Sequence, residues 1–137
     1  MTGALKLMPV VLALGLGQPV GAAPVDPCAT LQDLLQQIDE ALTRDEAGTP
    51  VAQVDMLRIK LAATKAGLGI SDASDSWPDP RSKPSVRAVS AAAKGPEGGP
   101  FDAVFAAQTL RREGPVLAEG LAAGCPVAAL PPRYSAQ

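Results

Sequence analysis

Two cysteines, Cys28 and Cys125, carry the most reactive side chains of the sequence. A cysteine can bear a lipid, bind a metal, act as a nucleophile or form a disulfide, and each role needs different neighbours. A redox or nucleophilic role is favoured by a Cys-x-x-Cys motif or an adjacent basic residue, and neither cysteine has one. The chain also has no histidine, so it lacks the commonest zinc ligand and the commonest general base.

The first 22 residues indicate the compartment in which these cysteines would react. Lys6 is followed by an apolar run over 7–17, and small residues then lead to Val20 and Ala22. This layout predicts a cleaved secretory signal peptide over 1–22. Retention as a membrane anchor is the alternative, although the run is only about half of the roughly 20 residues that cross a bilayer. We therefore expect a mature protein without a membrane span, in the periplasm or the extracellular space.

Export favours a disulfide between Cys28 and Cys125, because exported chains meet an oxidising compartment and the cysteine count is even. Lipidation of Cys28 fits less well, since Asp26 and Pro27 stand between it and the apolar run. Two buried free thiols are the alternative to the bridge. The bond would staple a thin core, because the chain has 47% apolar residues but only 3% aromatic ones.

The elements that must position the cysteines are helices with apolar stripes. The spacing predicts a first helix that Asp26 caps and Pro27 opens, ending before Gly48. Its stripe comprises Cys28, Leu31, Leu35, Ile38 and Leu42, and Leu34 widens it. A second helix is expected from Pro50 to near Gly67, with two apolar stripes that favour packing on more than one neighbour. They are Val51, Val54, Leu57, Leu61 and Leu68, and Met56, Ile59, Ala63, Ala66 and Ile70.

The second half of the chain alternates loops and shorter helices. Residues 71–100 are rich in Pro, Ser and Asp and predict a long loop, within which 85–94 could form a short helix. Helices are expected over 100–113 and 115–124, separated at Gly114–Pro115. Residues 131–137 begin with two prolines and predict a flexible tail. The fold expected for 23–130 is therefore an all-α, disulfide-stapled bundle of three to five helices.

Clustered carboxylates are the remaining candidates for catalysis or metal binding. Asp72, Asp75 and Asp79 lack the spacing of a calcium loop and fit turn chemistry instead. The acidic pairs 39–40 and 45–46 are expected on a solvated helix face. We therefore predict no catalytic residue, no metal and no cofactor.

Binding is the class of function that these exclusions leave. The longest basic cluster is Arg111–Arg112, so we expect no nucleic-acid partner. Trp77, in the long loop, could contact a protein partner or pack on the helices as a lid. The leading hypothesis is an exported, non-enzymatic accessory or protein-binding module. A periplasmic carrier of a small apolar ligand in a helix-lined cavity is the alternative, and an enzyme that uses carboxylates alone comes third.

Overall fold

The computed structural model describes residues 26–72, 82–125 and 129–135, and these ranges contain helices and no strand. The helices are α2 (Pro27–Glu46), α3 (Gln53–Asp72), α4 (Ser82–Ala91), α5 (Ala103–Gly124) and the single turn α6 (Pro132–Ser135). A short 3-10 turn, η3 (Pro96–Gly98), precedes α5. The expected all-α bundle is confirmed.

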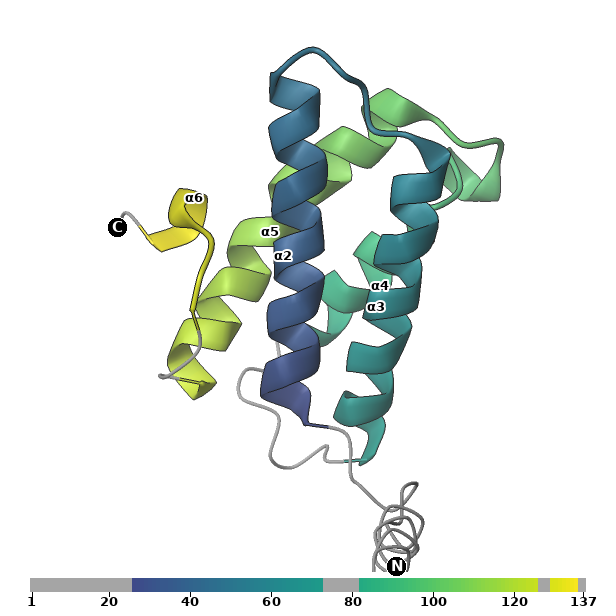
Figure 1. Cartoon of the computed structure of the whole chain (residues 1–137). Helices are drawn as coiled ribbons and strands as arrows, with labels where there is room; N and C mark the ends of the chain where they lie inside the picture. The colour runs from purple at the N-terminus through teal and green to yellow at the C-terminus, as the bar shows by residue number, and fades with distance from the viewer. Residues whose placement is uncertain (1–25, 73–81, 126–128, 136–137) are drawn as a thin grey trace, which may run out of the picture.

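The four long helices form a ring around one core. Helix α2 packs against α3, α3 against α4, α4 against α5, and α5 returns to α2. Figure 1 shows α2 and α3 side by side, with α5 crossing obliquely behind α2 and α6 lying at the outer side of α5. Each helix therefore has two neighbours and needs an apolar stripe wide enough for both.

Helix α2 begins and packs as the sequence predicts. The Asp26 side chain accepts a hydrogen bond of 3.0 Å from the backbone N–H of Cys28 and so caps the helix. The buried stripe contains the predicted residues of this face, joined by Ala41: Leu31, Leu34, Leu35, Ile38 and Leu42. After the helix, Gly48 adopts a φ of +102°, a conformation that glycine adopts without strain.

Of the two stripes predicted for this helix, α3 buries the described residues of one and exposes Val54, Leu57 and Leu61 of the other, while Val51 is buried ahead of the helix. The side chains of Leu68 and Ile70 lie outside the described residues. Met56, Ile59, Ala63 and Ala66 lie in the core together with Ala62. The helix starts at Gln53 rather than Pro50 and continues to Asp72, past the predicted stop at Gly67. A glycine within a helix costs about 1 kcal/mol relative to alanine, which the packing of a long buried face outweighs.

Helix α5 is continuous where the sequence predicted two helices. Pro115 removes one backbone donor, but its exposed ring points away from the core. Leu110, Leu117 and Leu121 lie on one buried face that extends across the proline. A break at Pro115 would turn half of this face away from the core, so packing keeps the helix intact.

Two smaller elements also differ from the sequence-based expectation. Helix α4 covers Ser82–Ala91, three residues earlier than the short helix considered over 85–94. Residues 132–135 form α6, and Tyr134 is buried, whereas a flexible tail was expected from 131. The signal peptide predicted over 1–22 and the loop residue Trp77 lie outside the described residues, so both remain predictions.

The Cys28–Cys125 disulfide joins the two ends of the ring. Cys28 lies in the first turn of α2, and Cys125 follows the last residue of α5, with a Cα–Cα distance of 5.9 Å and a sequence separation of 97. The described residues include no free cysteine. The bond therefore holds the start of α2 against the end of α5.

Removing this bond should destabilise the protein strongly. We expect the double variant Cys28→Ser/Cys125→Ser to lose up to about 4.7 kcal/mol of unfolding free energy, because a loop of about a hundred residues is no longer closed in the unfolded chain. Denaturant unfolding of the unreduced protein gives the measurement, and reduced wild type is the matched control. Equal midpoints for the variant and the unreduced wild type would contradict the expectation.

Candidate functional site

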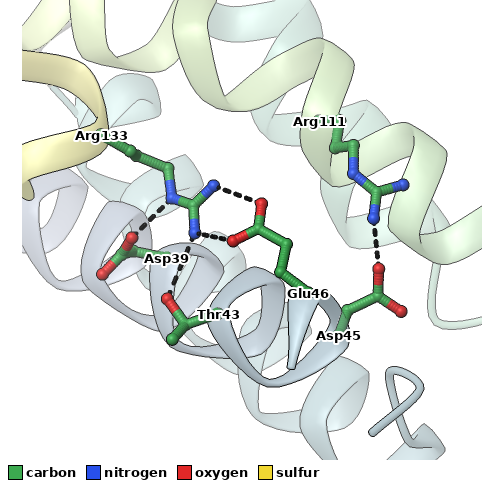
Figure 2. Close-up of polar contacts among 6 residues, drawn as sticks. All are labelled: Asp39, Thr43, Asp45, Glu46, Arg111 and Arg133. Carbon is green, nitrogen blue, oxygen red and sulfur yellow. Dashed lines mark hydrogen bonds and ion pairs between the residues drawn. The ribbon is translucent and has the colours of Figure 1, made fainter. Parts of the chain in front are cut away.

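Arg133 of α6 makes the densest set of polar contacts that the structure describes. Its Nε donates to Asp39 Oδ1 at 2.6 Å, and its two terminal nitrogens donate to the two Glu46 oxygens at 2.9 Å each. Nη2 also donates to Thr43 Oγ1 at 3.2 Å. Figure 2 shows the guanidinium lying over this side of α2. Because all three partners belong to α2, Arg133 ties the C-terminal turn to the first helix.

These contacts change the acidity of the groups involved. The hydrogen bonds from Arg133, and then its charge, hold the pKa of Glu46 below the usual value for a glutamate. The same hydrogen bonds, to Glu46 and Asp39, raise the pKa of Arg133. The pair therefore stays ionised at neutral pH, and Glu46 is a poor proton carrier there.

Tyr134 forms the second half of this C-terminal attachment. Its side chain is buried against Gly114 of α5, where an added Cβ would overlap the tyrosine hydroxyl. Within the described structure the hydroxyl has no hydrogen-bond partner, and burial raises the pKa of Tyr134 to about 12. We call Arg133 and Tyr134, with the α2 and α5 residues that they contact, the C-terminal clasp.

Other ion pairs connect the long helices. Arg111 of α5 pairs with Asp45 of α2, as Figure 2 shows. Arg44 reaches Asp55 at the start of α3 at 2.8 Å, and Ser85 of α4 donates to Glu113 of α5 at 2.7 Å. The carboxylates of Asp39, Asp45 and Glu46, expected on a solvated face, thus bind arginines of distant segments. This arrangement serves structure better than proton transfer.

Sequence reasoning identified the disulfide and missed the clasp. One signal was present: Asp39, Thr43 and Glu46 recur at steps of four and three, which places them on one side of a helix. The sequence gives no sign that Arg133, more than eighty residues later, meets them. In the described ranges, no group of potential ligand side chains is arranged to hold a metal ion.

The outward face of α3 is the clearest surface that the fold leaves uncovered. Val54, Leu57 and Leu61 are 52%, 52% and 58% exposed, and they belong to the stripe that the sequence predicted to be apolar. Residues three or four apart are neighbours on a helix, so these three form one continuous apolar stripe. By the same spacing, Arg58, Lys60 and Lys65 border it.

An open groove lies beside this stripe, between α3 and α4. It has a volume of about 640 Å³ and is lined from α3 by Lys60, Ala63 and Gly67. The opposite side comes from α4, from the turn after it, and from Phe105 of α5. We call this hollow the α3–α4 groove.

Comparisons with protein-family models, curated proteins and solved structures find no match for this chain. Among the described helices, none is long and apolar enough to cross a membrane.

The clasp should make stability depend on acidic pH. Because the pKa of Glu46 is lowered in the folded protein, its contribution is present above the unfolded value near 4.5 and is lost as pH falls through the lower folded value. We expect Arg133→Met to reduce the unfolding free energy at neutral pH by roughly 1 kcal/mol. The unfolding free energy of the variant should also fall less steeply than that of the wild type as the pH is lowered. Chemical unfolding across a pH series gives the measurement.

Arg112→Met is the matched control for this experiment. Arg112 pairs with its neighbour Glu113 and is 60% exposed, so its loss should change stability by less than about 0.5 kcal/mol. Equal effects of the two variants would contradict a structural role for the clasp.

The ionisation of Tyr134 reports directly on whether α6 is docked. Tyr134 is the single tyrosine of the chain, so the near-ultraviolet absorbance of tyrosinate follows this residue alone. We expect a midpoint near 12 in the folded protein and about 10 in denaturant. Stability should accordingly fall as pH rises between these two values, since the unfolded chain releases the proton first. A midpoint near 10 in the folded protein would mean that α6 is not docked.

Proposed function

We propose that this protein is an exported, non-enzymatic protein-binding module and that the apolar stripe of α3 is its contact surface. The observation that carries the proposal is the exposure of Val54, Leu57 and Leu61 on one helix face. Scattered exposed apolar residues are ordinary on protein surfaces, whereas a continuous row marks a site of interaction. The fold does not need the row, because the core uses the opposite face of α3.

The border of the stripe defines the chemistry of the partner. Arg58, Lys60 and Lys65 border the apolar centre, while Asp33 and Glu40 of α2 line a hollow beside Leu61. The complementary surface is therefore an apolar groove or helix face whose acidic groups meet these three cations. A second copy of this chain fits poorly, since pairing two α3 helices would bring these cations together. The partner is therefore a different protein with an acidic, amphipathic contact surface.

Export is the second part of the proposal. The predicted signal peptide over 1–22 supports it, and a disulfide is compatible with a periplasmic or extracellular location. Two observations support the proposal that the protein is not an enzyme. The sequence has no histidine, and the carboxylates of Asp39 and Asp45 form ion pairs with arginines. The alternative of a carrier that encloses its ligand in an apolar cavity is not favoured, since the α3–α4 groove is open.

Photo-crosslinking in the native exporting cell can identify the partner. A photoreactive residue replaces Leu61, and the matched control carries it at the exposed Ala123 near the far end of α5. We expect a protein adduct from position 61 and none from position 123. Adducts that are absent from both positions, or equal at both, would contradict the proposal.

The identified partner then allows a quantitative test. Leu57→Ser should weaken its binding about tenfold or more while changing the stability of the free protein by less than about 0.5 kcal/mol. Ile59→Ser is the contrasting variant, because Ile59 is buried and its loss should destabilise the fold. Affinity should also fall with added salt if an acidic rim meets Arg58, Lys60 and Lys65. Unchanged affinity for Leu57→Ser would exclude the stripe.

A further inference from the structure

The α3–α4 groove exists because small residues line both of its walls. Ala63 and Gly67 face it from α3, and Ser90 and Ala91 face it from α4. Larger side chains at these positions would fill the space, as side chains do in closely packed interiors. At Gly67 an added Cβ would meet nothing within 4 Å, so the hollow is open at that point.

The floor of the groove is apolar. Ala63, Val86 and Ala93 are buried in the core and show their remaining surface to the groove, and Phe105 adds a partly buried ring. A volume of about 640 Å³ is in the range of small-molecule sites in proteins. The floor therefore suits a hydrocarbon group rather than a polar one.

The lining also contains three cations from three different positions. They are Lys60 of α3, Arg87 of α4 and Lys94 of the turn after α4, and one carboxylate, Glu97, accompanies them. In the described part of the chain, none of the three lies within ion-pair distance of a carboxylate. The net charge around the groove is positive although the whole chain carries −2.

This accumulation contrasts with the rest of the surface. The other described arginines, Arg44, Arg58, Arg111, Arg112 and Arg133, all have carboxylate partners. The described cations without such a partner, Lys60, Lys65, Lys83, Arg87 and Lys94, all belong to α3, α4 and the turn after α4. An anion bound in the groove would supply the partner that three of them lack.

The end wall of the groove is a tight turn with one strained residue. Glu97 has φ +57° and ψ +30°, the left-handed region that non-glycine residues seldom adopt. The turn is closed by a hydrogen bond of 2.9 Å from Gly95 N–H to Gly99 O, and a Cβ at Gly95 would overlap the carbonyl oxygen of Pro100. Strained backbone of this kind is commonly retained where a ligand is held.

We propose that the α3–α4 groove binds a free, monomeric, single-chain amphiphile with an anionic head group. The hydrocarbon chain lies on Ala63, Val86, Ala93 and Phe105, and the head group is held by Lys60, Arg87 and Lys94. The proposal does not depend on protein binding by the α3 stripe, although Lys60 lies beside both surfaces. The monomer, rather than a membrane surface, is the expected ligand because the apolar floor lies within a hollow between two helices.

Calorimetric titration of the disulfide-bonded, exported protein tests the ligand class. The probes are dodecanoate below its micelle concentration and two amphiphiles of the same chain length, dodecanol and dodecyltrimethylammonium. We expect saturable binding of dodecanoate, binding of the alcohol weaker by about tenfold or more, and no binding of the cation. No binding of dodecanoate, or equal binding of all three, would overturn the proposal.

Matched variants test the location. Gly67→Leu adds a side chain into the open part of the groove and raises helix propensity, so it should fold and lose dodecanoate binding. Arg87→Gln should weaken binding about tenfold. Lys65→Gln is the control, because Lys65 lines a separate hollow between α2 and α3. Binding that survives Gly67→Leu, or that falls equally with Lys65→Gln, would exclude this groove.

Vesicles distinguish the free amphiphile from a membrane surface. Sedimentation with phosphatidylglycerol vesicles and with phosphatidylcholine vesicles should show no more binding than a Gly67→Leu control. Binding to the anionic vesicles without binding of monomeric dodecanoate would overturn the proposal and assign the basic face to membranes.

Discussion

The disulfide between Cys28 and Cys125 is the constraint on which the arrangement of the helices depends. The core is built from leucine, isoleucine, valine and many alanines, and alanine buries little area per residue. The bond joins the start of α2 to the end of α5, which are the two ends of the ring of long helices. It therefore restricts the unfolded chain by closing a long loop, which supplements a core of small side chains. The C-terminal clasp adds a second tie at the same helix pair, since Arg133 contacts α2 and Tyr134 contacts α5.

Features that depend on local rules could be predicted from the sequence. Asp26 caps α2 because a carboxylate one residue before a proline-initiated helix can accept the free N–H groups of the first turn. The stripe from Leu31 to Leu42 follows from a helical period alone. The cysteine pairing followed from the predicted signal peptide and from the presence of two cysteines, each with one possible partner in the chain. The sequence also predicted two apolar stripes on the second helix, but it does not indicate that the bundle would cover Met56, Ile59 and Ala63 and leave Val54, Leu57 and Leu61 exposed.

Features that depend on distant packing could not be predicted. Gly67 and Pro115 are breakers by local propensity, yet each lies within a long helix, and the buried face of α5 continues on both sides of Pro115. Tyr134 folds back because Gly114 leaves room for a ring against α5, and neither residue indicates the other in sequence. The ion pairs of Asp39 and Glu46 likewise required the position of α6. In each case the contact that determines the structure joins residues that lie far apart in the sequence.

Charge pairing divides the described surface into two regions with different roles. Around α2, α5 and α6 the arginines are neutralised by carboxylates, and these contacts hold helices together. Around α3 and α4 the lysines and Arg87 lack such partners, and the apolar stripe and the groove lie among them. Lys60 adjoins both surfaces, because it lines the groove and lies three residues from Leu57. An anion held in the groove would therefore reduce the positive potential beside the stripe and weaken its attraction for an acidic partner, so the two proposed sites are coupled through one side chain.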